Sequence, residues 1–455
     1  MNCVEKNKVL IAGTGKSGIA AAKMILQMGG ETVLYNSDPA TDPRAVMSQF
    51  DEGDRVTLIT GKLYAPQLGD VSMCVISPGI SLREEFVKVI DKAGLPVLGE
   101  LEVAYQASKG KICAITGTNG KTTTVSLCGE ILRQAFKDVH VAGNIGVPFA
   151  EEALKTTEKS ATCLEVSSFM LETIMDFHPH VSAILNITPD HLDRHRTMRN
   201  YIRCKEAIAF NQTEDDYIIL NYEDEELRKF GTQKKLRPHV VWFSCDREPE
   251  GDAVFLREKD IMAKISGEYK KIISIDHLNI IGKHNYENVC AAVAVALMMG
   301  VTPEKAAKAC RNFKAVEHRI EFVRERIGVR YYNDSKGTNP DAAIKALEAM
   351  PGPTLLIAGG YDKNAEYDDW VKLFKGKVRY AILMGATRDK ISECCKKHGF
   401  KEIIYADDME EAVKTCASYA DEGDYVLLSP ACASWGMYKN FEERGKDFKN
   451  IVNTL

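Results

Sequence analysis

Residues 111–124 have the residue types of a phosphate-binding loop: a short β-branched run leads into glycines, hydroxyls and a lysine. Glycines let the backbone turn tightly and point N–H groups at phosphate, and the positive end of the following helix adds to the attraction. Lys121 is expected to reach the β- and γ-phosphates, and the Thr122 hydroxyl to hold magnesium. The usual pattern has glycine where this chain has Ile115, so the segment predicts a shorter variant of the nucleotide triphosphate loop, with a plain glycine turn and a surface lysine as the alternative. The loop residues expected to bind nucleotide are Gly117, Thr118, Asn119, Gly120, Lys121, Thr122 and Thr123.

A second glycine turn, Gly13-Thr14-Gly15-Lys16-Ser17-Gly18, lies between a predicted strand at residues 8–12 and a predicted helix at residues 19–28. This G-x-G-x-x-G arrangement, with Asp38 about twenty residues after the last glycine, is typical of a dinucleotide fold. The same turn serves any diphosphate. The pattern therefore predicts a nucleotide-binding unit without identifying the nucleotide.

Polar side chains follow the carboxyl ends of three predicted strands, which is where open α/β sheets bind ligands. The first group is Ser77-Pro78-Gly79, although a plain proline-glycine turn fits that segment equally well. Glu165 ends a central strand, and His191 follows the next strand, predicted at residues 181–187. A carboxylate and an imidazole beside a phosphate loop could hold a divalent cation, for which Glu165 is the ordinary ligand type and His191 an unusual one. His191 could instead be a hydrogen-bonded core histidine, and the spacing of Lys205 is that of one more solvated helix lysine.

Strand-like and helical runs alternate almost throughout the chain, which predicts an α/β fold of parallel sheets covered by helices. Because 455 residues exceed the size of a single core, we expect three domains. These are an N-terminal Rossmann-like domain (1–99), a central P-loop ATPase-like domain with a mostly parallel sheet (100–315) and a C-terminal Rossmann-like domain (316–455). Further expected elements are a strand at 32–35, a helix at 287–299 and strands at 354–358, 380–384 and 425–429.

The composition is that of an ordinary globular enzyme, with 45% hydrophobic and 27% charged residues. The net charge of −5 gives no basic footprint for nucleic acid, and no run reaches the roughly 18 apolar residues that span a bilayer. The first residues lack the organisation of a signal peptide, so we expect a cytoplasmic protein without membrane insertion. The thirteen cysteines are scattered, without a C-x-x-C pair, and predict reduced thiols rather than a disulfide framework or a zinc site.

Eight short motifs, spread over essentially the whole chain, resemble those of the Mur ligase family. In order and spacing they are most similar to its D-glutamate-adding branch, and the segments SPGI, DSKGTN and SPACAS discriminate best among the branches. The motifs are GTNGKTT, GNIG (143–146), LEVSSFMLE (164–172), NITPDHLDRH (186–195), GKHNYEN (282–288), EHRIE (317–321), NDSKGTNP (333–340) and SPACASW (429–435).

The resemblance implies roles for residues along the whole chain, with ATP on the variant loop and Lys121, Asn144, His191 and Lys205 as catalytic groups. Two magnesium ions, or manganese, would be held by Thr122, Glu165, His191 and Lys205, the last after carbamylation, which turns an ammonium into an oxygen ligand. ATP would also be positioned by Asn285, Asn288, Arg319 and Asp334. The nucleotide-sugar would contact Gly15, Lys16, Ser17, Ser37, Ser77, Pro78, Gly79, Asn144, Ser167 and His191. D-Glutamate would contact Lys336, Thr338, Lys363, Ser434 and Phe441.

The implied reaction is amide formation between UDP-N-acetylmuramoyl-L-alanine and D-glutamate, driven by ATP, in peptidoglycan precursor synthesis. The alanyl carboxylate attacks the γ-phosphate to give an acyl phosphate, and the amine of D-glutamate then displaces phosphate. Lys121 and the metal ions would offset the repulsion between carboxylate and triphosphate. Closure of the third domain would exclude water from the acyl phosphate. The resemblance further implies a monomer and leaves the base that deprotonates the amine open.

Four other functions stay open at this point. Within the same class, the chain could be a sister Mur ligase that adds another amino acid, or a folylpolyglutamate synthetase, although the N-terminal glycine turn argues against the latter. A NAD-dependent dehydrogenase would use the turn at Gly13 and Asp38 but leave the phosphate loop unexplained. A nucleotide-binding module would bind ATP and release no phosphate. One departure from the family is the pair Ser37-Asp38, because an aspartate beside a diphosphate would repel it unless Lys16 compensates.

Overall fold

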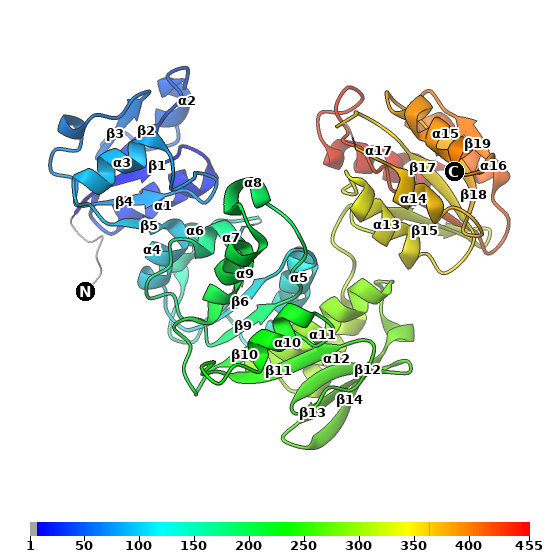
Figure 1. Cartoon of the computed structure of the whole chain (residues 1–455), viewed down its shortest axis with the longest axis horizontal. Helices are drawn as coiled ribbons and strands as arrows, with labels where there is room; N and C mark the ends of the chain where they lie inside the picture. Colours follow the sequence, from blue (N-terminus) through cyan, green and yellow to red (C-terminus); the bar gives the residue numbers. More distant parts are fainter. Residues whose placement is uncertain (1–6, 145, 364) are drawn as a thin grey trace. The chain divides into compact units, whose positions relative to one another are not determined.

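The structure, a computed structural model, describes residues 7–144, 146–363 and 365–455. Two expectations fall outside these residues: the character of the first six residues, and Ile145 within the motif at 143–146. The described chain is an α/β protein of three domains, each built around its own sheet (Figure 1). It divides into two compact units, of which one joins the chain through Ile273 with Asn288–Cys310 and the other joins Ser274–Glu287 with Arg311–Leu455.

The N-terminal domain has a parallel five-stranded sheet in the order β3-β2-β1-β4-β5. Its strands β1, β2 and β4 send alternate apolar residues into two different cores, as expected for strands covered by helices on each side. Chain order reverses at β1, which places a ligand crevice at the carboxyl ends of β1 and β4. The elements are β1 Lys8–Ala12, α1 Lys16–Gln27, β2 Glu31–Asn36, α2 Pro43–Met47, β3 Val56–Thr60, η1 Ala65–Gln67, β4 Met73–Ile76, α3 Glu85–Lys92 and β5 Val97–Gly99.

The central domain has a nine-stranded sheet in the order β14-β13-β12-β11-β10-β9-β6-β8-β7. The pairs from β7 to β12 are parallel, and β12 and β13 form an antiparallel pair at the other end. β6, which leads into the phosphate loop, lies between β8 and β9. The elements are α4 Glu100–Ala107, β6 Lys111–Thr116, α5 Lys121–Leu132, β7 Val139–Gly143, α6 Phe149–Glu152, η2 Ala153–Lys155, β8 Ala161–Glu165, α7 Ser168–Leu171, β9 Val181–Ile184, α8 Leu192–His195, α9 Met198–Glu206, η3 Ala207–Ala209, β10 Tyr217–Asn221, α10 Glu225–Gly231, β11 His239–Ser244, β12 Ala253–Arg257, β13 Asp260–Ile265, β14 Glu268–Ser274, η4 Ile275–His277, α11 Lys283–Met298 and α12 Pro303–Asn312.

The C-terminal domain has a six-stranded sheet in the order β15-β16-β20-β17-β18-β19, parallel except for the pair β15–β16. Alternate residues of its central strand β17 enter two different cores, because successive strand side chains point to opposite faces. The elements are β15 Glu321–Arg326, β16 Val329–Asn333, α13 Pro340–Ala349, β17 Thr354–Ala358, α14 Asp368–Lys372, β18 Val378–Leu383, α15 Arg388–Lys397, β19 Ile403–Tyr405, α16 Met409–Tyr419, β20 Tyr425–Leu428 and α17 Phe441–Thr454.

The expected elements exist, with differences at their ends. The first helix begins at Lys16 rather than at residue 19, because the turn ends at Gly15, which is its N-cap. The strand expected at 181–187 ends at Ile184, and the next residues bond to the start of the phosphate loop, where Leu185 N donates to Thr116 O at 3.0 Å and Thr118 N donates to Asn186 O at 2.9 Å. The helix expected at 287–299 begins four residues earlier, at Lys283. The three domain ranges remain a prediction.

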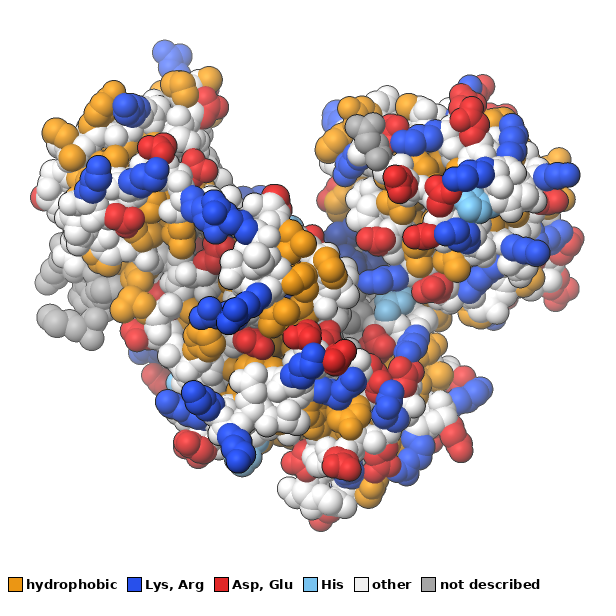
Figure 2. All heavy atoms as spheres, viewed as in Figure 1, with side chains coloured by type: hydrophobic (Ala, Val, Ile, Leu, Met, Phe, Trp, Pro, Cys, Tyr) orange, Lys and Arg blue, Asp and Glu red, His pale blue; other side chains and the backbone are white. Residues whose placement is uncertain are grey.

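None of the helices in the described ranges has the length and apolar character needed to cross a bilayer. On the face seen in Figure 2, blue and red side chains are interspersed over the coloured surface instead of gathering by sign.

Candidate active site

The phosphate loop joins β6 to α5, and its two glycines are required by its geometry. Gly117 has a φ angle of +150° and Gly120 one of +85°. Residues with a Cβ rarely adopt these backbone conformations. A Cβ at Gly120 would lie 2.3 Å from Asn288 Oδ1, and one at Gly117 would lie 2.9 Å from Leu185 Cβ. Asn119 N donates to Asn186 Oδ1 at 2.8 Å, which ties the loop to the end of β9. The loop leads directly into the N-terminus of a twelve-residue helix.

Two lysines converge on the carbonyl groups of this loop. Lys121 Nζ donates to Gly117 O at 2.8 Å and to Thr118 O at 2.9 Å. Lys205 Nζ, from α9, donates to the same Gly117 O at 2.9 Å and lies 4.8 Å from the centre of the Tyr201 ring. The reading of Lys205 as a solvated surface lysine is wrong, since the residue is only 2% exposed. Burial, with the nearby charge of Lys121, lowers the pKa of Lys205 to about 7.

The Glu165 carboxylate has one free oxygen beside this loop. Strand β8 pairs with β6, with Glu165 opposite Ile115, so the carboxylate lies at the loop end of the sheet. Oε1 accepts a hydrogen bond from Asn144 Nδ2 at 3.0 Å, whereas Oε2 is buried and has no hydrogen-bond partner among the described residues. A buried carboxylate oxygen left in this way is unfavourable unless a cation or a donor completes it. Its chemistry fits a hard divalent cation such as magnesium.

His191 is not a core histidine, because its side chain is 50% exposed. Its backbone adopts a left-handed conformation with φ of 51°, which is uncommon for a residue other than glycine and is often found at functional sites. The ring packs against Phe169, with centroids 4.9 Å apart. Phe169 lies in the first turn of α7, the helix that follows β8, so His191 is held near the end of that strand.

A cavity of about 600 Å³ lies at the crevice of the N-terminal sheet, where it reaches the central domain. Its size is in the range of small-ligand sites. Ser77 Oγ is buried there without a hydrogen-bond partner in the described part of the chain, and a Cβ at Gly13 would lie 2.5 Å from it. Its lining includes eight residues predicted to contact a nucleotide-sugar, namely Gly15, Lys16, Ser17, Ser37, Ser77, Pro78, Gly79 and Asn144.

Three residues of the sequence prediction are placed differently. Asp38 does not line the cavity, and its Oδ1 accepts from Ala40 N at 2.8 Å within its own loop, which removes the expected conflict with a diphosphate. Ser167 is the N-cap of α7 and accepts from Met170 N. Neither Ser167 nor His191 lines this cavity.

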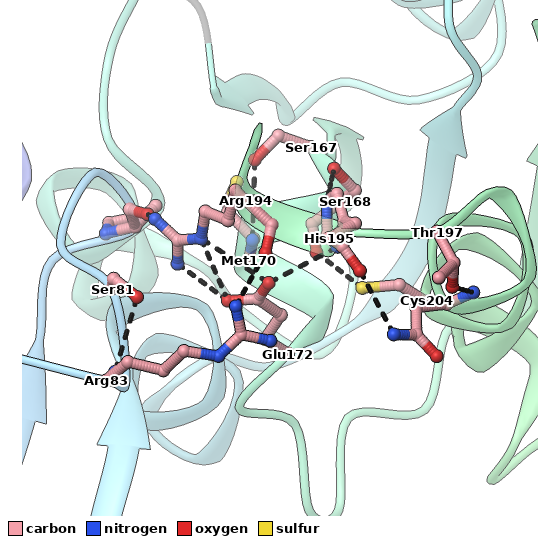
Figure 3. A network of polar contacts seen from close by, with 12 residues as sticks. Ser81, Arg83, Ser167, Ser168, Met170, Glu172, Arg194, His195, Thr197 and Cys204 are labelled. Carbon is pink, nitrogen blue, oxygen red and sulfur yellow. Dashed lines mark hydrogen bonds and ion pairs between the residues drawn. The ribbon is translucent and has the colours of Figure 1, made fainter. Parts of the chain in front are cut away.

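Arg194 connects the wall of the cavity to the central domain (Figure 3). Its Nη1 donates to Pro78 O at 2.9 Å and its Nη2 to Ile80 O at 3.0 Å, so it holds both ends of the turn that lines the cavity. The same guanidinium pairs with Glu172 at 2.6 Å and lies 4.2 Å from the centre of the Phe169 ring. The side chain is 12% exposed, so these contacts are made largely out of water. Arg194 thus fixes a loop of the N-terminal domain relative to the phosphate-loop domain.

The second compact unit carries its own polar cluster around Asp334. Asp334 is buried, its Oδ2 accepts from Ser429 Oγ at 2.8 Å, and burial raises its pKa to about 7. Arg319 lies between two residues with positive φ, His318 at 64° and Ile320 at 43°. Arg319 Nε is buried without a hydrogen-bond partner in the described ranges, which suits an anionic ligand. The predicted ATP residue Asn285 is also in this unit and donates to Ile281 O at 2.8 Å.

In this unit, two lysines predicted to bind the amino-acid substrate lie beside aromatic rings. Lys336 Nζ lies 5.6 Å from the centre of the Phe441 ring, and Lys363 Nζ lies 5.1 Å from the centre of the Trp435 ring. Ser434 is buried and Thr338 partly buried.

A buried arginine that the sequence analysis did not select organises these loops. Arg444 donates to Ser335 O at 2.8 Å and to Cys432 O at 3.1 Å, and therefore joins the loop before α13 to the loop after β20. Arg194 was missed in the same way. Both bond backbone carbonyls of other loops, for which no residue pattern exists. Arg194 lies inside the motif at 186–195, which was the available signal for it, whereas Arg444 lies outside the recognised motifs.

Three family models match the chain: residues 7–99 match "Mur ligase MurD-like, N-terminal domain", residues 115–296 match "Mur ligase middle domain" and residues 318–432 match "Mur ligase, glutamate ligase domain". Two relatives are named UDP-N-acetylmuramoylalanine--D-glutamate ligase. The one from Lachnoclostridium phytofermentans is 48% identical over 100% of this chain and 99% of its own length, and the one from Lachnospira eligens is 48% identical over 99% of each. A solved structure of MurF from Acinetobacter baumannii has a TM-score of 0.62 at 15% identity, covers 97% of this chain and 93% of its own, and shares the fold.

Proposed function

Because this chain belongs to the Mur ligase family, we propose that it is an ATP-dependent ligase that joins D-glutamate to UDP-N-acetylmuramoyl-L-alanine. The observation that carries the proposal is the full-length identity of 48% to relatives bearing that name. The products would be ADP, phosphate and the extended nucleotide-sugar. We place the reaction in cytoplasmic peptidoglycan precursor synthesis and take the chain to act as a monomer.

The cavity at the N-terminal crevice is the proposed site of the nucleotide-sugar. A volume of about 600 Å³ suits a nucleoside diphosphate, and the glycine turn with the start of α1 offers backbone N–H groups to its phosphates. Lys16 supplies a cation at the same turn. Asn144 belongs both to the cavity lining and to the Glu165 contact, which supports a substrate whose reactive end extends from the cavity toward the phosphate loop.

Thr122, Glu165, His191 and a carbamylated Lys205 are the residues that would hold two magnesium or manganese ions. The free oxygen of Glu165 supports this assignment, and so does a buried Lys205 whose pKa of about 7 leaves a neutral amine able to react with carbon dioxide. When bound, the ions would neutralise charge on the phosphates and on the attacking carboxylate. Glu165 and Asn144, joined by their hydrogen bond, would keep fixed positions beside them.

Lys121 has a defined task in the first step. Its ammonium rests on Gly117 O and Thr118 O, within reach of the N-terminus of α5 where the triphosphate would lie. Turning from these carbonyls to the β- and γ-phosphates would stabilise the charge that develops as the alanyl carboxylate attacks phosphorus. The acyl phosphate then gives the amide when the amine of D-glutamate displaces phosphate.

The C-terminal domain is the proposed site of D-glutamate. The amino acid carries two carboxylates, and Lys336 and Lys363 are the cations assigned to them. Phe441 and Trp435 lie beside these ammonium groups and restrict their positions. Thr338 and Ser434 would donate hydroxyl hydrogen bonds.

Phosphate release is the test, measured with ATP, magnesium and UDP-N-acetylmuramoyl-L-alanine. D-Glutamate, L-glutamate, L-lysine and meso-diaminopimelate are supplied in separate reactions. Release stimulated by D-glutamate alone, together with the mass of the extended product, is the expected result. Stimulation by another amino acid would make the chain a sister ligase. If no reaction releases phosphate and NADH fluorescence changes when the protein is added, the result would favour the dehydrogenase.

A further inference from the structure

We propose that Asp368, Cys394 and His398 form a binding site for one zinc ion on the C-terminal domain. A ligand atom from each residue lies within 4.8 Å of the other two. Carboxylate, thiolate and imidazole are the three ligand types that zinc takes in proteins. None of the three residues belongs to the sets assigned to nucleotide, metal or amino acid in the proposed reaction.

The fold holds the three side chains together. Cys394 and His398 lie one helical turn apart at the end of α15, where His398 N donates to Cys394 O at 3.1 Å. Residues at this spacing project from the same face of a helix. Asp368 begins α14, which packs against α15, and its Oδ1 lies 2.8 Å from His398 Nε2. A metal at this place would join the two helices.

The charge of the filled site is balanced. A thiolate, a carboxylate and a neutral imidazole around a doubly charged ion sum to zero, which avoids an unpaired charge in a half-buried place. Asp368 and His398 retain 39% and 22% exposure, so an ion can reach them from solvent. Three protein ligands leave the fourth tetrahedral position for water.

Binding requires the loss of one proton from Cys394. Burial and the neighbouring Asp368 raise the pKa of the thiol, so it is protonated in the metal-free protein. The zinc–sulfur bond forms as the sulfur–hydrogen bond breaks, and the proton passes to solvent. Lys397 and Lys372 are the cations near the cluster and act in the opposite direction on the thiol.

Lys397 is the competitor for the site. Its Nζ donates to Asp368 Oδ1 at 2.6 Å, and together with His398 it lowers the pKa of that carboxyl to about 2. Its side chain is 68% exposed and can turn into solvent. Removing this lysine should therefore strengthen metal binding. No such effect is expected if the three residues do not bind metal.

Two other clusters of metal-ligating atoms in the described residues fit an ion less well. In one, the Glu172 carboxylate is paired at 2.6 Å with Arg194, whose side chain is 12% exposed and held by further contacts, whereas the exposed Lys397 can leave Asp368. The other consists of three thiols in the core that are fully shielded from solvent, namely Cys113, Cys128 and Cys163.

Cobalt(II) is the probe, because cobalt bound to thiolate has a near-ultraviolet charge-transfer band and tetrahedral cobalt absorbs strongly in the visible. The full-length protein is reduced with a phosphine and titrated with cobalt in excess magnesium, which fills sites made of oxygen ligands. We expect saturation at a single equivalent and displacement by zinc. Lys397→Gln should reach saturation at lower cobalt concentration.

Matched variants assign the signal. Cys394→Ser should remove the thiolate band and His398→Gln should weaken cobalt binding at least tenfold. Cys204→Ser and Cys245→Ser, which remove partly buried thiols elsewhere, should leave the thiolate band unchanged. A thiolate band that survives Cys394→Ser would overturn the proposal, as would the absence of the band from both the wild-type protein and Lys397→Gln.

Discussion

Arg194 offers the most direct test of how the nucleotide-sugar site is built. Replacing it by alanine removes two charge-assisted hydrogen bonds, to Pro78 O and Ile80 O, in a largely buried place. Bonds of this kind contribute about 1.5–3 kcal/mol each, and the freed carbonyls recover part of that from water. If the free energy that holds the loop in place falls by about 2–3 kcal/mol, and binding requires that position, the nucleotide-sugar should bind roughly 30- to 150-fold more weakly.

The expected result is selective. Arg194→Ala should raise the KM for UDP-N-acetylmuramoyl-L-alanine and weaken UDP binding in calorimetry, while the KM for ATP stays within about twofold, because the phosphate loop keeps its own contacts. Arg194→Lys keeps the charge but cannot bridge two carbonyls and Glu172 at once, so it should fall between wild type and alanine.

Arg55 provides the matched control. It also bonds two backbone carbonyls, Gly29 O and Gly30 O, and pairs with a glutamate, yet the carbonyls that it holds belong to residues that do not line the cavity, unlike Pro78 and Ile80. Arg55→Ala should leave both KM values unchanged. Equal increases in the two KM values for Arg194→Ala, or the same effect in the Arg55 variant, would refute the reasoning, since either would report general loosening of the domain.

Three further outcomes are expected. Lys16→Ala should raise the KM for the nucleotide-sugar and not that for ATP; the lack of a selective change would remove Lys16 from the site. Lys205→Ala should lower kcat at least 100-fold. In the wild-type protein the pKa of Lys205 is lowered to about 7, so activity should rise as pH increases through 7, and so should the carbon-13 carbamate signal in labelled bicarbonate. Burial raises the pKa of Glu100 to about 7 from about 4.5, so the free energy of unfolding should fall by about 3 kcal/mol as pH rises from 4.5 through 7, and urea titrations of Glu100→Gln should lack this fall.

The sequence predicted the features that depend on local chemistry. The phosphate loop, the glycine turn of the N-terminal domain and most strands follow from short patterns whose physical requirements lie within a few residues, as the positive φ angles of Gly117 and Gly120 illustrate. Ends of elements were less predictable, because the last residues of a strand are decided by partners such as Thr116 O, far from residue 185 in sequence.

Burial was the property that residue spacing did not give. The spacing of Lys205 indicated a solvated lysine although the residue is buried, and for His191 it left a core position open although the side chain is half exposed. A helix lysine and a histidine after a strand take their surroundings from other elements. Arg194 and Arg444 bond to backbone carbonyls that are far from them in the sequence, Pro78 O and Ser335 O. The absence of a C-x-x-C pair predicted no zinc site, yet Cys394 and His398 meet an aspartate that precedes them by some twenty-five residues or more, which spacing rules do not include.

Gly117 O links the two lysines of the proposed reaction. It accepts from both Lys121 Nζ at 2.8 Å and Lys205 Nζ at 2.9 Å, so two ammonium groups share one oxygen. Like charges held this close disfavour each other, which is part of the reason that the pKa of Lys205 falls. Carbamylation would end the repulsion, because the modified side chain is an anion and attracts Lys121 instead. Triphosphate would end it from the other side by drawing Lys121 away from the carbonyl. Since each change relieves the same repulsion, the Lys121 contact makes ATP binding and carbamylation compete. Without divalent cations, we therefore expect the carbamate signal to weaken when an ATP analogue is added, and to weaken less in Lys121→Ala.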